Sequence, residues 1–208
     1  MPDSGEIAAI ILAAGASSRF GADKLLHPVT RYGVTLPLAA HSLLPWLKTL
    51  GRTTVIVRPE SQTFCRAIEH ALGSTYTSRF NWLVCADAAQ GMAHSIACGV
   101  RANIDATAWL IGLADMPAVP ASAIADVRNA LLSGAAIAAP FNAGKRGHPA
   151  GFSSHYREEL LALSGDAGAR HIIERDHSKV VHIPIEDGGI FADIDTPGDL
   201  QLIGGQTK

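Results

Sequence analysis

The chain of 208 residues is 48% hydrophobic and 17% charged, which is typical of a folded globular protein and not of a disordered one. Its net charge of −2 argues against broad electrostatic capture of nucleic acid or of an anionic membrane. The longest apolar run falls well short of the roughly 20 residues that a membrane-spanning helix needs, and the acidic start does not resemble a signal peptide.

The predicted elements alternate between strands and helices along the whole chain. The predicted strands are residues 7–14, 53–57, 81–85, 109–114, 135–139 and 179–183. The predicted helices are residues 35–50, 63–72, 90–102, 120–132, 155–163, 168–175 and 197–203. This alternation predicts an α/β fold of three layers with a mainly parallel sheet. No repeat, low-complexity tract or linker divides the chain, so we predict a single domain over residues 1–208.

The first strand leads into a loop of small, hydroxyl and cationic residues, with the sequence IAAIILAAGASSRFGADK over residues 7–24. The Ile-rich run predicts a strand buried on both faces, and Gly15 is expected to let the chain leave it in a conformation that a side chain would forbid. A Gly/Ser turn with cations at the end of such a strand indicates phosphate binding; the alternative is an ordinary connection with solvated cations. The glycine spacing fits neither a P-loop nor a dinucleotide-binding fold, which disfavours an NAD(P)-dependent oxidoreductase.

Two acidic sites follow later in the chain. Asp115, in the sequence LADMP, ends a predicted buried strand and is either a helix cap or a ligand of a metal ion. We favour the ligand, because the next helix starts several residues further on. Asp193 and Asp195 alternate in an extended stretch and should face the same side, with local capping as the alternative. Thr196 is expected to begin a helix in whose first turn Asp199 is structural.

Two glycine-led segments add further candidates. In QGMAHSIACGV, over residues 90–100, a helix starting at Gly91 offers N–H groups, and Ser95 could bind a base or sugar, while Gly99 is expected to permit close packing on the sheet. In FNAGKRGHPAG, over residues 141–151, two cations and a histidine lie in a glycine-rich loop. This loop is either functional or a mobile surface hairpin.

Cysteine and histidine usage limits the kind of metal that this chain would bind. Cys65, Cys85 and Cys98 are widely spaced and form no C-x-x-C pair, so neither a disulfide framework nor a zinc knuckle is expected, and a cytoplasmic location fits. The nine histidines show no spacing typical of a metal site. A bound metal should therefore be a hard, oxygen-liganded ion such as Mg²⁺.

Taken in order, these motifs resemble those of the MobA-like nucleotidyltransferases over nearly the whole chain. The matching segments are the loop that ends at Lys24, the G-M-x-x-S of residues 91–95, the A-D-M-P of residues 114–117, the G-H-P of residues 147–149 and the D-I-D-T-P-x-D-L of residues 193–200. The Ala-Ala-Gly of residues 13–15 is most similar to the molybdenum cofactor cytidylyltransferase branch, since the guanylyl branch generally has Ala-Gly-Gly. One departure is YGVTLPL at residues 32–38, where the family usually has a compact G-x-P-L-L.

The resemblance implies a Rossmann-like nucleotidyltransferase fold and an enzyme that transfers CMP from CTP to the phosphate of molybdopterin, with Mg²⁺ and release of pyrophosphate. It implies nucleotide binding by Leu12, Ala13, Ala14, Gly15, Ser17, Ser18, Arg19, Lys24, Gly91, Ser95 and Asp115. Among these, Arg19, Lys24 and Asp115 would be catalytic. The implied metal ligands are Asp115 and Asp195, with Asp193 as the alternative to Asp195. The implied acceptor-binding residues are Gly147, His148 and Pro149. The later run over residues 160–173, which includes LSGDAGAR at residues 163–170, resembles the acceptor-side segment of the cytidylyltransferase branch.

Other functions stay open. Within the same class, the alternative is transfer of GMP to the molybdenum cofactor, or of a nucleotide to another phosphorylated acceptor. In a different class, the chain would be a non-catalytic cofactor-binding chaperone for molybdoenzyme maturation, although the joint presence of both cations and both carboxylates argues against this. The expected partners are an NTP, a molybdopterin-type acceptor and a molybdoenzyme client or its maturation chaperone.

Overall fold

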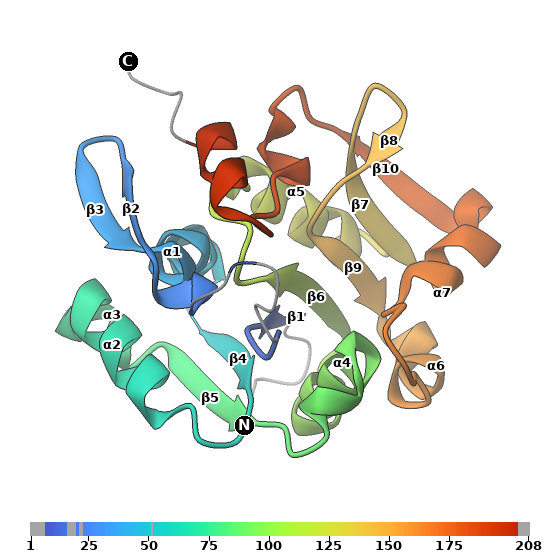
Figure 1. Ribbon diagram of the computed structural model, residues 1–208. Coiled ribbons are helices and arrows are strands. Elements are labelled where there is room, and N and C mark those ends of the chain that lie inside the picture. The colour runs from blue at the N-terminus through green and yellow to red at the C-terminus, as the bar shows by residue number, and fades with distance from the viewer. Residues whose placement is uncertain (1–6, 16–19, 21–22, 51, 204–208) are drawn as a thin grey trace.

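A computed structural model of the chain describes residues 7–15, 20, 23–50 and 52–203. The described residues form an eight-stranded sheet and a separate two-stranded hairpin. Across the sheet, the order is β10 (Val180–Pro184), β7 (Ile137–Asn142), β9 (Ala150–Ser153), β6 (Ala108–Leu113), β1 (Ile7–Leu12), β4 (Thr53–Val57) and β5 (Phe80–Val84), while β8 (Lys145–Arg146) pairs with β7. In Figure 1 this row runs from the upper right to the lower left.

The sheet is mainly parallel, as predicted. β1 pairs in parallel with β4 and with β6, β4 pairs with β5, and β7 pairs with β10. The strand β9 runs antiparallel between β6 and β7. The prediction of a loop over residues 141–151 is therefore correct only in part, because β7 extends to Asn142, β8 completes a hairpin with it, and β9 begins at Ala150.

Side chains of β1 alternate between two hydrophobic cores, one on each face of the sheet. Ile11 packs into the core formed with α1 (Leu38–Leu50), α2 (Gln62–Leu72) and α5 (Ala121–Leu132). Ile10 packs into the core formed with α4 (Met92–Ala102), α6 (Arg157–Leu161) and α7 (Arg170–Arg175). Figure 1 shows α1 and α5 on one side of the row of strands and α4 and α6 on the other. The predicted three-layer, Rossmann-like α/β fold is thus confirmed.

Most predicted helices form with shifted boundaries. The largest correction is at the start of α1, where the prediction placed helix from residue 35. Residues Val34–Pro37 instead form β3, which pairs with β2 (Pro28–Arg31) as a hairpin. The remaining short helices are α3 (Ser74–Thr77) and the 3₁₀ helices η1 (Lys24–Leu26), η2 (Ala88–Gln90), η3 (Ser154–Tyr156), η4 (His177–Lys179), η5 (Gly188–Phe191) and η6 (Pro197–Leu202).

Close packing of α4 on the sheet depends on Gly99. A Cβ atom at this position would lie 2.6 Å from Cγ2 of Ile10 on β1, so any side chain would push the helix away from the sheet. The prediction for Gly99 is confirmed. Because α4 starts at the carboxyl edge of the sheet, this contact also fixes where the beginning of the helix lies.

The three cysteines are free thiols, and burial raises the pKa of Cys65 and raises that of Cys98 to about 11. Both thiols are therefore protonated at neutral pH and are weak nucleophiles. Within the part of the chain that the structure describes, no helix is long and apolar enough to cross a membrane.

Candidate active site

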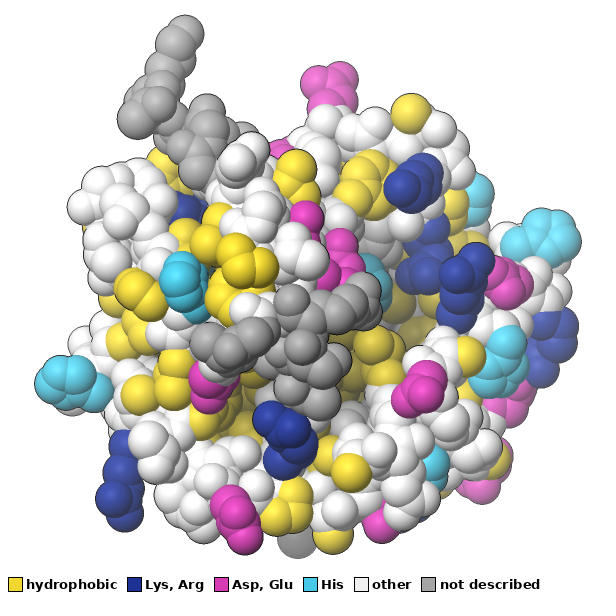
Figure 2. Space-filling view, viewed as in Figure 1, with side chains coloured by type: hydrophobic (Ala, Val, Ile, Leu, Met, Phe, Trp, Pro, Cys, Tyr) yellow, Lys and Arg dark blue, Asp and Glu magenta, His cyan; other side chains and the backbone are white. Residues whose placement is uncertain are grey.

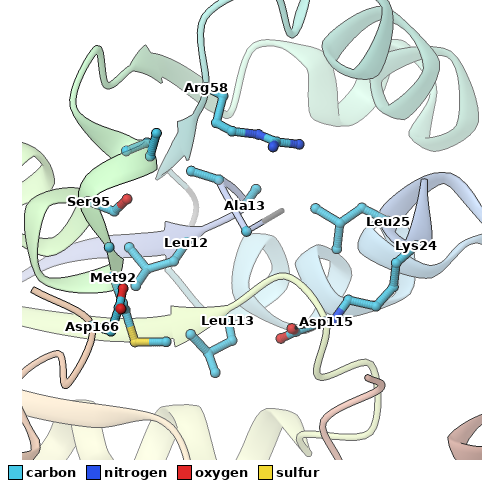
Figure 3. A pocket seen from close by; sticks show the side chains of 15 residues that line it. Leu12, Ala13, Lys24, Leu25, Arg58, Met92, Ser95, Leu113, Asp115 and Asp166 are labelled. Carbon is cyan, nitrogen blue, oxygen red and sulfur yellow. Dashed lines mark hydrogen bonds and ion pairs between the residues drawn. The ribbon is translucent and has the colours of Figure 1, made fainter. Parts of the chain in front are cut away.

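The carboxyl ends of β1, β4 and β6 border a cavity of about 350 Å³, here called the first cavity. This edge of the sheet is where open α/β folds bind their ligands. The first cavity is lined by Leu12, Ala13, Ala14, Gly15, Lys24, Leu25, Arg58, Ala88, Ala89, Gly91, Met92, Ser95, Leu113, Asp115 and Asp166. Figure 3 shows Lys24 and Asp115 at one end of it and Met92 and Asp166 at the other. In Figure 2, hydrophobic side chains are visible in a hollow on this face, with Lys and Arg side chains beside it.

The structure brings the predicted nucleotide-binding residues together, as far as it describes them. All eight that are described line the first cavity: Leu12, Ala13, Ala14, Gly15, Lys24, Gly91, Ser95 and Asp115. Ser17, Ser18 and Arg19 lie outside the described residues, and their contacts with phosphate stay predictions.

Lys24 lies between two carboxylates at one end of the first cavity. Its Nζ donates a hydrogen bond of 2.9 Å to Oδ2 of Asp115 and one of 3.2 Å to Oδ1 of Asp195. The Lys24 side chain is only 8% exposed, and a buried ammonium is stable only when it is paired. The resemblance placed Lys24 on the substrate phosphates and did not indicate this pairing with both candidate metal ligands.

Backbone hydrogen bonds hold Asp115 against β1. The N–H of Ala114 donates to the carbonyl of Leu12 at 3.0 Å, so the chain after β6 stays alongside β1. The N–H of Ile194 donates to the carbonyl of Asp115 at 3.0 Å, which joins the two acidic segments directly. The alternative that Asp115 caps the following helix is wrong, because Pro120 is the N-cap of α5.

Asp199 fixes the backbone beside Asp195. Its Oδ2 accepts hydrogen bonds from the N–H of Asp195 at 3.0 Å, the N–H of Thr196 at 2.7 Å and the hydroxyl of Thr196 at 2.9 Å. The bonds from Thr196, followed by the one from Asp195, lower the pKa of Asp199. Thr196 thus begins the helix as predicted, although η6 is a 3₁₀ helix. Of the two aspartates considered as the second metal ligand, Asp195 is the one that contacts Lys24. The pKa of Asp193 is raised, first by partial desolvation and then by the negative charge of Asp195.

The chemistry of this carboxylate pair suits a hard divalent cation. Oδ1 of Asp115 is buried and has no hydrogen-bond partner among the described residues. Carboxylate oxygens, supplemented by substrate phosphates and water, are the ligands that Mg²⁺ prefers. Within the described ranges, no group of three or more His, Cys, Asp or Glu side chains could hold a metal. A cation on Asp115 and Asp195 would therefore depend on additional oxygen ligands such as phosphate.

Helix α4 starts at the first cavity with Gly91 as its N-cap, as predicted. Gly91 has a φ of +122°, and a Cβ atom there would clash with Oδ1 of Asp166 and with the carbonyl oxygen of Gly165. The N–H of Ala93 donates to that carbonyl at 3.1 Å, so the prediction of unused N–H groups at this helix start is wrong for Ala93. Ser95, which is 2% exposed, lies in the cavity wall one turn further on.

Gly15 does not use the conformational freedom expected of it. Its φ lies outside the left-handed region, and an added Cβ atom would meet no described atom within 4 Å. The prediction of a glycine-only conformation at this position is therefore wrong. Strand pairing instead continues past β1, since the N–H of Ala13 donates to the carbonyl of Ile56 at 2.9 Å.

A second cavity of about 300 Å³ adjoins the first. The two cavities share Leu12, Met92, Leu113 and Asp166. The other lining residues of the second cavity are Ile96, Ile111, Arg146, His148, Ala150, Phe152, Ala167, Gly168, Ala169, Arg170 and Ile173. Of the three predicted acceptor-binding residues, His148 lines this cavity, whereas Gly147 and Pro149 are not part of its lining.

His148 lies beside the second cavity as a neutral imidazole. The backbone N–H of His148 donates to the carbonyl of Ile190 at 2.9 Å, and Gly147 has no room for a side chain because a Cβ atom would lie 2.7 Å from Ile190. Burial, and then the charge of Arg146, lower the pKa of His148 to about 4. Its Nδ1 is buried and lacks a partner among the described residues, so the imidazole has hydrogen-bonding capacity left for a ligand.

Comparison with known proteins decides the family. Residues 9–180 match the family model of the MobA-like NTP transferase domain. The chain belongs to this family. It is also 30% identical over 202 residues to the purine catabolism protein PucB of Bacillus subtilis (strain 168), covering 93% of this chain and 94% of that protein. The chain is accordingly a nucleotidyltransferase of the MobA-like type, and its substrate is an NTP.

Solved structures share the fold of this MobA-like domain. Rv0371c from Mycobacterium tuberculosis H37Rv aligns with a TM-score of 0.77 at 22% identity, covering 97% of this chain and 98% of that chain. A structure of Rv0371c described as a complex with manganese aligns with a TM-score of 0.75 at 20% identity, covering 97% of this chain and 100% of that chain. At these identities, the likeness shows the mixed α/β architecture and does not extend to the ligands.

Two charged residues of the first cavity, Arg58 and Asp166, were not among the residues predicted to bind the nucleotide in this MobA-like domain. Arg58 directly follows β4, so the reasoning that singled out Asp115, a polar residue at the end of a buried strand, also applies to it. Asp166 lies in the irregular segment between α6 and α7, where no periodicity marks it. It reaches the first cavity because this segment packs against Gly91.

Proposed function

We propose that this nucleotidyltransferase transfers CMP from CTP to the phosphate of a molybdopterin-type acceptor, with Mg²⁺ and release of pyrophosphate. The observation that carries this proposal is the convergence of Lys24, Asp115 and Asp195 at one end of the first cavity. The choice of CTP and of the acceptor is supported by the Ala-Ala-Gly of residues 13–15, which resembles the molybdenum cofactor cytidylyltransferase branch. The name of the Bacillus relative refers to purine catabolism and specifies neither a base nor an acceptor.

The proposed reaction requires alignment and charge neutralisation, without a covalent enzyme intermediate. An oxygen of the acceptor phosphate attacks the α-phosphorus of CTP, the bond from this phosphorus to the α,β-bridging oxygen breaks, and pyrophosphate leaves. The described lining of the first cavity fits this course, since it contains Ser95 but neither histidine nor cysteine to activate a protein nucleophile.

Each part of the site receives a role in this proposal. Asp115 and Asp195 would hold Mg²⁺, which supplies positive charge to the triphosphate and orients it. Lys24 and Arg19 would stabilise the negative charge that develops on the leaving pyrophosphate. The start of α4, with Gly91 and Ser95, would contact the base and ribose.

The acceptor is assigned to the second cavity. His148 lines it, and Gly147 and Pro149, its neighbours in the chain, would shape the turn that carries this imidazole. The shared wall between the two cavities would let the acceptor phosphate approach the nucleotide. A molybdoenzyme client or its maturation chaperone, as the receiver of the product, stays a prediction.

Pyrophosphate release tests this function directly. The assay combines the enzyme, Mg²⁺ and molybdopterin with CTP, GTP, ATP or UTP in separate reactions. We expect release with CTP to exceed release with each other NTP by about tenfold or more, which corresponds to one well-made polar contact with the base. Preference for GTP would overturn the choice of base. Stoichiometric nucleotide binding without release for any NTP would overturn catalysis and favour the chaperone.

A further inference from the structure

We propose that Arg146 and Arg170 form an anion-binding pair in the second cavity and select an acceptor that carries an anionic group at that point. The inference rests on the proposed function, because it takes the second cavity to be the acceptor site. Both arginines line this cavity, and neither has been given an individual role so far.

Arg146 is a partly buried cation without an ion-pair partner among the described residues. It lies on β8, and none of the described residues forms a hydrogen bond or ion pair with its guanidinium group. Burial and then the charge of Arg170 lower the pKa of Arg146, while Glu174 opposes this shift. A desolvated charge without a partner is costly, and an anionic ligand would remove that cost.

Arg170 adds a second cation with most of its hydrogen-bonding capacity unused. Its Nε donates to Oε1 of Glu174 at 2.6 Å, but the two side chains are 72% and 59% exposed. Such an exposed ion pair contributes little to stability, so Glu174 competes only weakly with an anionic ligand for Arg170. The other guanidinium nitrogens make no hydrogen bond to the described residues, and the planar fork of an arginine suits phosphate or another bidentate anion.

The remainder of the cavity favours an amphipathic occupant. Ile96, Ile111, Phe152 and Ile173 provide an apolar surface that would accommodate a ring system. Among the described lining residues, Asp166 is the one acid, and it lies in the wall shared with the first cavity. The two arginines therefore give this cavity a local positive excess within a chain whose net charge is −2.

The segment that carries Arg170 is docked on the nucleotide side of the site. The carbonyl of Gly165 accepts the hydrogen bond from Ala93 at the start of α4. Gly168 packs against the same helix, since a Cβ atom there would lie 3.1 Å from Sδ of Met92. This docking holds the guanidinium pair at a defined position relative to the nucleotide, as transfer between two bound substrates requires.

Kinetic constants for each substrate separate this role from a general effect. Arg146→Gln and Arg170→Gln are assayed for pyrophosphate release with CTP and molybdopterin as the varied substrates. We expect the KM for molybdopterin to rise by about tenfold or more in each variant, with the KM for CTP within about twofold of wild type. Arg146→Lys, which keeps the charge, should recover part of the loss.

Two matched controls belong to this experiment. Arg66→Gln removes an exposed arginine from α2, on the opposite face of the sheet, and should leave both constants unchanged. Glu174→Gln removes the carboxylate that pairs with Arg170 and should not raise the KM for molybdopterin. An unchanged KM for molybdopterin in both arginine variants, in an enzyme that uses molybdopterin, would overturn the inference and leave the proposed function standing.

Equilibrium titration without nucleotide identifies the anion that the arginines bind. The probes are molybdopterin and its dephosphorylated form, which retains the dithiolene. If Arg146→Gln binds molybdopterin more weakly than wild type does but binds the dephosphorylated form equally well, the arginine pair contacts the phosphate. If the variant binds both probes more weakly, the pair contacts the dithiolene end. If the wild-type chain neither binds nor uses molybdopterin, the proposed function fails and inorganic phosphate becomes the probe. Loss of phosphate binding in Arg146→Gln would then support the anion site, and equal binding would overturn it.

Discussion

The ammonium group of Lys24 lies 2.9 Å from Oδ2 of Asp115, although 91 residues separate the two positions. Asp195, which is 171 residues from Lys24, completes the group at 3.2 Å. Three segments that are distant in sequence, after β1, after β6 and before η6, therefore meet at a single buried charge. Two carboxylates and one ammonium carry a combined charge of −1, which favours the approach of a further cation.

Replacing Asp115 with asparagine should reduce pyrophosphate release by about 10² to 10³-fold. The amide keeps the shape of the side chain and can still accept from Lys24, but it removes the negative charge that a divalent ligand site requires. Asp126→Asn, at an exposed position on α5, is the matched control and should keep wild-type rates. Wild-type turnover in Asp115→Asn would contradict its assignment as a metal ligand.

Replacing Lys24 with methionine should lower the free energy of unfolding by about 1–3 kcal/mol. Two carboxylates would then face each other without their cation, but both are partly exposed, at 26% and 34%, which limits the cost. Urea unfolding measures the change, with Lys48→Met, an exposed lysine of α1, as the control.

The same Lys24 variant also tests cation binding without any turnover. Mg²⁺ or Mn²⁺ should raise the unfolding temperature of Lys24→Met more than that of the wild type, because the uncompensated carboxylates bind the cation more tightly. Identical shifts in the two proteins would show that the carboxylates do not form a cation site.

Replacing Gly91 with alanine should be more damaging than the same change at Gly134. Both glycines have positive φ, +122° and +93°, so both variants lose roughly 1–2 kcal/mol of stability through backbone strain. At Gly134 a Cβ atom would meet nothing within 4 Å, whereas at Gly91 it would clash with Asp166 and Gly165. Thermal unfolding and the KM for CTP measure the difference, and we expect a higher KM in Gly91→Ala alone. Equal effects would mean that the Gly165–Asp166 contact has no role at the nucleotide site.

The low pKa of His148, about 4, predicts a loss of stability in acid. The unfolded chain has the ordinary histidine pKa of about 6.5, so between pH 6.5 and 4 the unfolded state binds more protons than the folded state. Stability contributed by the neutral imidazole is therefore complete above pH 6.5 and declines as the pH falls, by about 3 kcal/mol in total. Urea unfolding across this range, for wild type and His148→Gln, isolates the effect because all other groups are common. Parallel curves for the two proteins would contradict it.

Buried strands and their polar ends could be predicted from sequence, because continuous apolar runs followed by a charged residue leave few alternatives in an α/β chain. Asp115 was found in this way. The hairpin of β2 and β3 was not predicted. Its tip consists of Tyr32 and Gly33, which both have the positive φ that a two-residue turn requires. The apolar spacing from residue 35 onward favoured a helix, and the pairing of Thr30 with Thr35 outweighed it.

Contacts between the predicted residues could not be derived from the motifs. Each motif specified residue types at given positions in the sequence, but the distance from Lys24 to Asp195 depends on how η1 and the segment before η6 pack together. Asp166 was marked only by its segment, which resembles the acceptor side of the cytidylyltransferase branch, and its place in the first cavity depends on a docking contact with Gly91 rather than on a periodic pattern. Sequence therefore indicated which chemical groups are present, and the fold determined which of them act on one another.

The wall shared by the two cavities has a consequence for the end of the reaction cycle. Under the proposed function, the dinucleotide product occupies both cavities at once, and each half raises the effective concentration of the other. The product is then held more tightly than either substrate, so its dissociation limits steady-state turnover. A burst of pyrophosphate in the first turnover would report this, and a receiving protein that withdraws the dinucleotide would accelerate the enzyme without touching its catalytic residues.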